Sequence, residues 1–143
     1  MRNGATKVLK WFAAAYVVAI LVQVFLAGEG IFRIGVITKD DCDKKGARCV
    51  ANSRTLDAHR ELGTILVFAS ILFLIVALVA WHRNRSVRVV SIVAPVVTFL
   101  QIVFAAIGGW AGGLHAVDAF IVLALFGWLF HRLRAEPDGG GAA

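Results

Sequence analysis

Residues 56–81 read LDAHRELGTILVFASILFLIVALVAW, a short polar entry followed by an almost unbroken apolar segment. About 20 mostly apolar residues are enough for a helix to cross a bilayer, so this stretch predicts a membrane-spanning helix. His59 lies where that helix begins, with Asp57, Arg60 and Glu61 around it. A histidine among charged residues at a helix entry is the first candidate for a functional side chain.

Three further segments meet the same criterion of length and apolar content. The four expected helices cover residues about 8–28, 60–81, 87–108 and 114–131. The chain has 143 residues, of which 59% are hydrophobic and 17% charged, and its mean hydropathy is +0.80, as in membrane proteins. We therefore expect an all-α membrane protein. It should be an antiparallel bundle of four transmembrane helices that forms one domain over 1–134, with a flexible tail at 135–143.

The positions of Lys and Arg predict the orientation of the bundle. Eight of them lie tightly against three helix ends that should share one side of the membrane: Arg2, Lys7, Lys10, Arg83, Arg85, Arg88, Arg132 and Arg134. The other side carries seven in and beside the long loop 29–59, and none in the link 108–113. The positive-inside rule then places both termini in the cytoplasm and the loop 29–59 on the outer side of a bacterial cytoplasmic membrane. Because the basic residues cluster beside apolar runs, the net charge of +6 does not indicate nucleic-acid binding.

Cys42 and Cys49 are the only cysteines, and both lie in the loop 29–59. A disulfide between them would form on the oxidising, outer side, in agreement with the orientation from charge. The closed loop is short, so its entropic stabilisation would be about 2–3 kcal/mol at most. The alternative is a pair of free thiols.

The sequence also suggests an internal repeat of two helical hairpins. Gln23-Val-Phe-Leu-Ala-Gly28 near the end of the first helix parallels Gln101-Ile-Val-Phe-Ala-Ala106 near the end of the third. Helix two opens with Ala58-His59 and helix four with Leu114-His115. Two pseudo-repeated helical hairpins, related by an axis along the membrane normal, would make His59 and His115 equivalent. The alternative is chance similarity between apolar helices.

Two opposed histidines can hold haem iron between them. Such a site needs small residues where the ring approaches the backbone and polar groups that orient each imidazole. Gly63 follows His59 by four residues, and Ala119 follows His115 by four, so each lies on its histidine's face. Asp118, three residues after His115, is close enough to orient that imidazole.

Other polar residues at the same end complete the predicted site. Arg60 and Arg54 are suited to haem propionates. Gln23 and Gln101 could line the same pocket or form hydrogen bonds between helices. His82 and His131 lie about 140° and about 160° around their helices from the outer pair, so we interpret them as interfacial anchors.

These residues support a resemblance. The outer-loop cysteines, His59-Arg60, Gln101 and His115 together resemble one half of haem A synthase, whose chain is two four-helix halves. The segments Gln23 to Gly28, His59-Arg-Glu-Leu-Gly63 and Leu114-His115-Ala116 also resemble a family of uncharacterised four-helix bacterial membrane proteins. The resemblance implies a bis-histidine haem site at His59 and His115. It does not imply the synthase reaction, because Leu56 stands where the synthases have a glutamate and the second half is absent.

Two classes of function follow from the sequence. The first is a b-type-cytochrome-like protein that binds haem for electron transfer, haem handling or sensing. The second is a cofactor-free accessory or assembly subunit of a larger membrane complex. The expected partners are the lipid bilayer, a redox protein or membrane complex, and a second copy of the chain.

Overall fold

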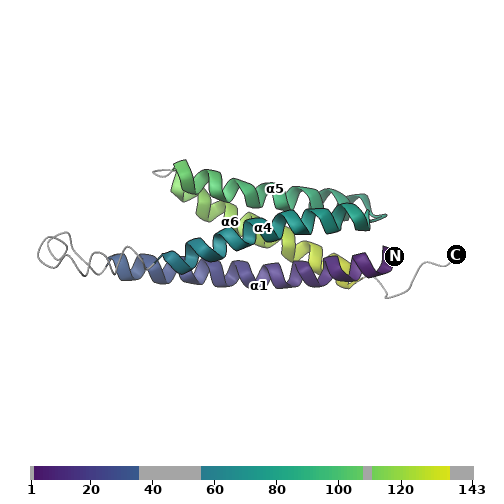
Figure 1. The fold of residues 1–143 in the computed structure, drawn as a ribbon, viewed down its shortest axis with the longest axis horizontal. Coiled ribbons are helices and arrows are strands. Elements are labelled where there is room, and N and C mark those ends of the chain that lie inside the picture. Colours follow the sequence, from purple (N-terminus) through teal and green to yellow (C-terminus); the bar gives the residue numbers. More distant parts are fainter. Residues whose placement is uncertain (1, 36–55, 108–110, 136–143) are drawn as a thin grey trace, which may run out of the picture.

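The computed structural model describes residues 2–35, 56–107 and 111–135, and these form a bundle of long helices (Figure 1). The helices are α1 (Arg2–Gly35), α4 (Asp57–Ala80), α5 (Arg85–Ile107) and α6 (Ala111–Arg134). Each contains a segment long and apolar enough to cross a membrane. Successive helices run in opposite directions, so the start of α1 and the end of α6 lie at the same end of the bundle (Figure 1). We call the opposite end, where α4 and α6 begin, the distal end.

The four helices form a closed ring. Helix α1 packs against α4 and α6, and α5 packs against the same two helices. As a result, α4 and α6 lie diagonally across the bundle. Side chains that point inward from the first turns of α4 and α6 therefore face each other across the bundle axis.

Helix α1 is longer than its apolar segment. The membrane-spanning part covers Gly4–Glu29, close to the 8–28 expected from hydropathy, but the helix itself runs from Arg2 to Gly35. Beyond Glu29 the helix continues through Gly30-Ile-Phe-Arg-Ile-Gly35, in which Arg33 is the only charged residue. The additional turns carry α1 past the start of α4 at the distal end (Figure 1).

The outer surface of the bundle is apolar. Phe25 and Phe68 are each 69% exposed, and Val79 is 70% exposed. In water such a surface would aggregate, whereas in a bilayer it contacts lipid tails that are as apolar as the side chains themselves. The exposed apolar residues therefore support the assignment of all four helices to the membrane.

The core is a contiguous aromatic cluster. Phe73 packs edge-on against Phe12 and Phe126, with ring centroids 5.4 and 4.9 Å apart, and Tyr16 stacks on Phe126 at 4.0 Å. The Tyr16 hydroxyl donates a hydrogen bond of 2.7 Å to the backbone carbonyl of Leu66. This bond ties α1 to α4 at a depth where no water is available to satisfy either group.

The turn between α4 and α5 has a defined geometry. Trp81 ends α4 in the left-handed region, with φ at 36°, and its N–H donates to the Ala77 carbonyl. The Asn84 side chain accepts hydrogen bonds from the N–H groups of Ser86 and Val87, which begin α5. The connection from α4 to α5 is therefore tight and fixes α5 beside α4.

Candidate functional site

His59 is held against α1 by Gln23. The imidazole Nδ1 lies 3.1 Å from the Gln23 backbone carbonyl, and the Gln23 side-chain amide donates to the His59 carbonyl at 2.8 Å. The same amide nitrogen lies 3.5 Å from His59 Nε2. Glutamine and histidine thus hold each other through both backbone and side-chain groups.

His115 makes the equivalent bond to α5. Its Nδ1 lies 2.9 Å from the backbone carbonyl of Gln101. A carbonyl oxygen can only accept, so Nδ1 must carry the proton in both histidines. In a neutral imidazole with a protonated Nδ1, Nε2 keeps its lone pair free for a metal. In the neutral form of each histidine, Nε2 is therefore the nitrogen that could bind a metal.

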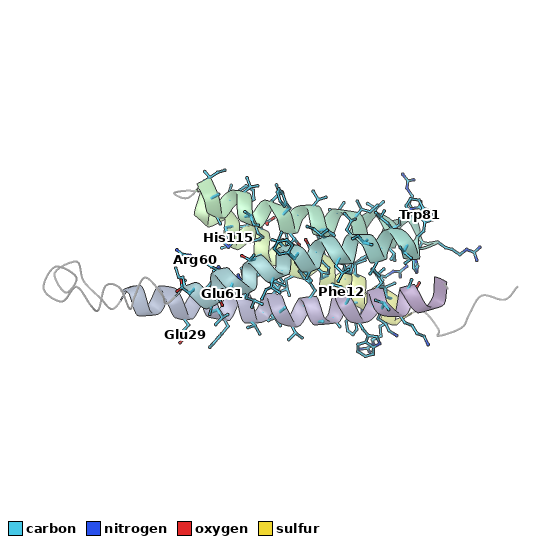
Figure 2. The ribbon with its side chains drawn as sticks, viewed as in Figure 1. Phe12, Glu29, Arg60, Glu61, Trp81 and His115 are labelled. Carbon is cyan, nitrogen blue, oxygen red and sulfur yellow. The ribbon has the colours of Figure 1, made fainter. Side chains whose placement is uncertain are left out.

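The two imidazoles face each other at the distal end of the bundle. Their ring centroids are 6.1 Å apart and their planes are nearly perpendicular, at 81°. Two imidazole nitrogens on opposite sides of one metal, each about 2.0 Å from it, place the ring centres roughly 6 Å apart. The observed separation is close to that value, and it is also that of an ordinary edge-to-face ring contact. Figure 2 shows His115 near Arg60 at this end, with Trp81 at the other.

Two histidines supply two ligands to a metal at this end of the bundle. In the described parts of the chain, no three or more His, Cys, Asp or Glu side chains come together to hold a metal. Structural zinc usually takes four protein ligands and catalytic zinc three. Haem iron needs only axial ligands from the protein, because the porphyrin supplies the others.

Gly63 makes the close contact between α4 and α1 possible. A Cβ added at Gly63 would lie 3.0 Å from the Gln23 side-chain nitrogen, closer than ordinary van der Waals contact. The Gln23 amide therefore occupies space that any larger residue at position 63 would fill. Gly63 is a small residue near the histidine, as expected, and its immediate neighbour is a glutamine side chain.

Asp118 is buried beside Gln101. Its side chain is on the inner face of α6, and the residue is only 5% exposed. It faces the Gln101 side chain, yet Asp118 Oδ2 and Gln101 Nε2 both lack a hydrogen-bond partner among the described residues, as does Gln23 Oε1. The sequence suggested Asp118 as the group that orients His115, but His115 Nδ1 donates its hydrogen bond to the Gln101 carbonyl. Three unsatisfied polar atoms thus surround the histidine pair.

Arg60 belongs to the rim of the site rather than to its centre. Arg60 is exposed at the distal end, where its guanidinium forms a loose ion pair of 3.8 Å with Asp57. Arg54 and the cysteines Cys42 and Cys49 lie outside the described residues. Their predicted roles, including the disulfide, stay predictions.

His82 and His131 are far from the other two histidines along the bundle. His82 lies beyond the end of α4, where its Nδ1 accepts a hydrogen bond of 3.1 Å from the Asn84 N–H. His131 is exposed in the last turns of α6.

Sequence reasoning missed two features of the site. The first is that the backbone carbonyls of the glutamines, rather than their side chains, bind the imidazole Nδ1 atoms. Nothing in a sequence reveals which helical carbonyl faces a histidine of the next helix. The second is Tyr16, whose hydroxyl faces those of Ser70 and Thr98 in the core below the site. As the only tyrosine of the chain, and within an apolar run, it was a recognisable signal.

No protein-family model, curated protein or solved structure matches this chain. We therefore infer the function of the protein from the arrangement of its own residues.

Proposed function

We propose that this membrane protein binds haem between His59 and His115 at the distal end of the bundle, as a b-type-cytochrome-like protein. The observation that carries the proposal is the matched state of the two imidazoles. Each donates its Nδ1 proton to a backbone carbonyl of the preceding helix, and the rings are 6.1 Å apart. Hydrogen bonding of one ring nitrogen to a carbonyl is the usual way in which proteins orient a metal-ligating histidine.

The remaining residues fit a bound haem. The rings approach from diagonally opposed helices, so the porphyrin edges would face α1 and α5, where Gln23 and Gln101 lie. When bound, haem supplies an iron that accepts and releases one electron. The chain orients both imidazoles through the glutamine carbonyls. Arg60, at the rim, is the residue type that pairs with a propionate.

An internal duplication would explain the matched histidines, and the burial pattern supports it. Four buried residues of α4 stand seven, eleven, fourteen and eighteen positions after His59: Leu66, Ser70, Phe73 and Ala77. Four buried residues of α6 stand at the same spacings after His115: Val122, Phe126, Leu129 and Leu133. The hairpins α1–α4 and α5–α6 would then be related by a twofold axis along the bundle.

The first and third helices show the same correspondence. Leu9, Ala13, Tyr16 and Ile20 are buried fourteen, ten, seven and three positions before Gln23. Val87, Ser91, Ala94 and Thr98 are buried at the same spacings before Gln101. Eight matched burials extend the likeness well beyond the short motifs that first suggested it.

Three further parts of the proposal concern topology and reactivity. The distal end is assigned to the outer side of a bacterial cytoplasmic membrane and both termini to the cytoplasm, because the eight basic residues at the opposite end lie tightly against the helix ends. A disulfide between Cys42 and Cys49 would belong to that outer side. A synthase-type oxidation is not proposed, because Leu56 stands where the synthases have a glutamate.

The test is the absorption spectrum of the purified protein after expression with ample haem. We expect a Soret band that shifts on reduction and is lost when His59 and His115 are both replaced by alanine. The matched control replaces His82 and His131 by alanine, which should leave the band unchanged. A wild-type protein that stays colourless refutes the proposal and favours the cofactor-free accessory subunit.

A further inference from the structure

The two histidines differ in what surrounds Nε2. The Gln23 amide lies 3.5 Å from His59 Nε2 while it donates to the His59 carbonyl. Gln101 makes only the backbone bond to His115, and its side-chain Nε2 has no hydrogen-bond partner among the described residues. The Gln23 amide thus shields His59 Nε2, whereas among the described residues His115 Nε2 has no such amide neighbour.

Two residue differences between the hairpins account for this asymmetry. Gly63, four positions after His59, leaves room for the Gln23 amide, which lies 3.0 Å from where a Cβ would stand. At the same spacing after His115, Ala119 carries that Cβ. A Gln101 side chain in the corresponding place would meet the methyl group, so the place open to Gln23 is closed to Gln101.

The second difference gives the Gln101 amide a different neighbour. Three positions after His115 stands the buried carboxyl of Asp118, whereas the same spacing after His59 holds Leu62. The Gln101 side chain faces Asp118. The surroundings of the two histidines therefore differ because Leu62 and Gly63 of α4 correspond to Asp118 and Ala119 of α6.

We propose that the histidines are unequal ligands: His115 is the permanent one, and His59 is exchangeable because Gln23, seated on Gly63, competes for its Nε2. This inference rests on the proposed haem site and deepens it. A site with one exchangeable ligand accepts a small neutral molecule that binds ferrous iron, on the side of His59. That property favours sensing or handling of such a molecule over electron transfer alone, which works best when both ligands are fixed.

The first experiment measures coordination in the haem-loaded protein, with carbon monoxide as the probe. Wild-type protein should show a five-coordinate fraction in its spectrum and bind carbon monoxide readily. Gln23→Ala should raise the six-coordinate, low-spin fraction and weaken carbon monoxide binding roughly three- to tenfold, the effect of removing one competing hydrogen bond. Val22→Ala is the matched control, since Val22 is 44% exposed toward lipid on the same turn.

Gly63→Ala should act in the same direction, because its methyl group displaces the Gln23 amide. Its control is Gly127→Ala in α6, where an added Cβ meets nothing within 4 Å. His59→Ala should retain haem in a fully five-coordinate form, whereas His115→Ala should lose most of it. Equal haem loss in the two histidine variants, or a fully low-spin wild type that Gln23→Ala leaves unchanged, overturns the inference.

The second experiment needs no haem and so separates this inference from the proposed function. Diethyl pyrocarbonate acylates neutral imidazole, and mass spectrometry locates the modified residue. We expect His115 to react faster than His59 in the haem-free protein. In Gln23→Ala the reaction rate of His59 should rise toward that of His115. Equal rates in the wild type would refute the shielding by Gln23, whether or not the protein binds haem. A colourless protein with unequal rates would instead refute the haem site alone.

Discussion

Replacing Asp118 by leucine should stabilise the protein. Asp118 is only 5% exposed inside a membrane-spanning helix, and its Oδ2 has no hydrogen-bond partner among the described residues. An unsatisfied buried polar atom costs about 1–3 kcal/mol. Insertion scales assign about 2.5–3.5 kcal/mol to an aspartate at the centre of a membrane helix, and less toward its ends. Since Asp118 lies one turn from His115 near the distal end, we expect a gain of about 1–2 kcal/mol.

Leucine is the natural replacement because Leu62 holds the corresponding place in α4. The assay measures the free energy of reversible unfolding of the haem-free protein in mixed micelles, with helix content as the signal. A gain of about 1.4 kcal/mol appears as a tenfold change in the folding equilibrium constant. Asp118→Asn keeps a buried polar group of the same shape, so it should gain less than about 0.5 kcal/mol, within the usual range of a neutral change.

A destabilisation of 1 kcal/mol or more by Asp118→Leu would contradict the expected gain in stability. That result would mean that Oδ2 belongs to a satisfied network in the membrane. If the gain appears, the carboxyl is kept at a cost to stability, as expected for a group retained for function.

Substitutions at Tyr16, Phe73 and Trp81, with Phe68→Ala as a control, test the packing of the bundle. Tyr16→Phe removes the hydrogen bond to the α4 backbone and should cost about 0.5–1.5 kcal/mol in unfolding free energy in micelles. Phe73→Ala should cost about 2–4 kcal/mol because it leaves a cavity at the centre of the aromatic cluster; Phe68→Ala, on the lipid-facing surface, should change the same free energy by less than about 1 kcal/mol. Trp81→Gly should be more stable than Trp81→Ala by about 1 kcal/mol, because both lose the ring but only glycine accepts the left-handed backbone without strain. Equal stability of these last two variants would contradict the strain at position 81.

The sequence by itself determined the number and approximate position of the helices. Hydropathy is a local property, so the apolar run ending at Trp81 is visible without any knowledge of its neighbours. Helical phase likewise separated His59 from His82, because the period of a helix is fixed by backbone geometry. The full length of α1, from Arg2 to Gly35, was less accessible, since Gly30 lowers helix propensity just beyond the apolar run.

The site could be predicted only in part. The sequence suggested that His59 and His115 approach each other, and the structure brings their rings to 6.1 Å. It also singled out Gln23, whose amide forms a hydrogen bond between helices, and Gly63, which lies close to it. For Asp118 the expected orienting bond to His115 is replaced by a bond from His115 to the Gln101 carbonyl.

Only the tertiary structure decided how these residues meet. The seat of Gln23 on Gly63 depends on the distance between α1 and α4, which follows from the packing of every side chain between them. The orientation of each imidazole depends on a backbone carbonyl of another helix, and all residues have the same carbonyl. A sequence identifies the groups along each helix, whereas the distances between helices decide which of these groups meet, and no local pattern contains those distances.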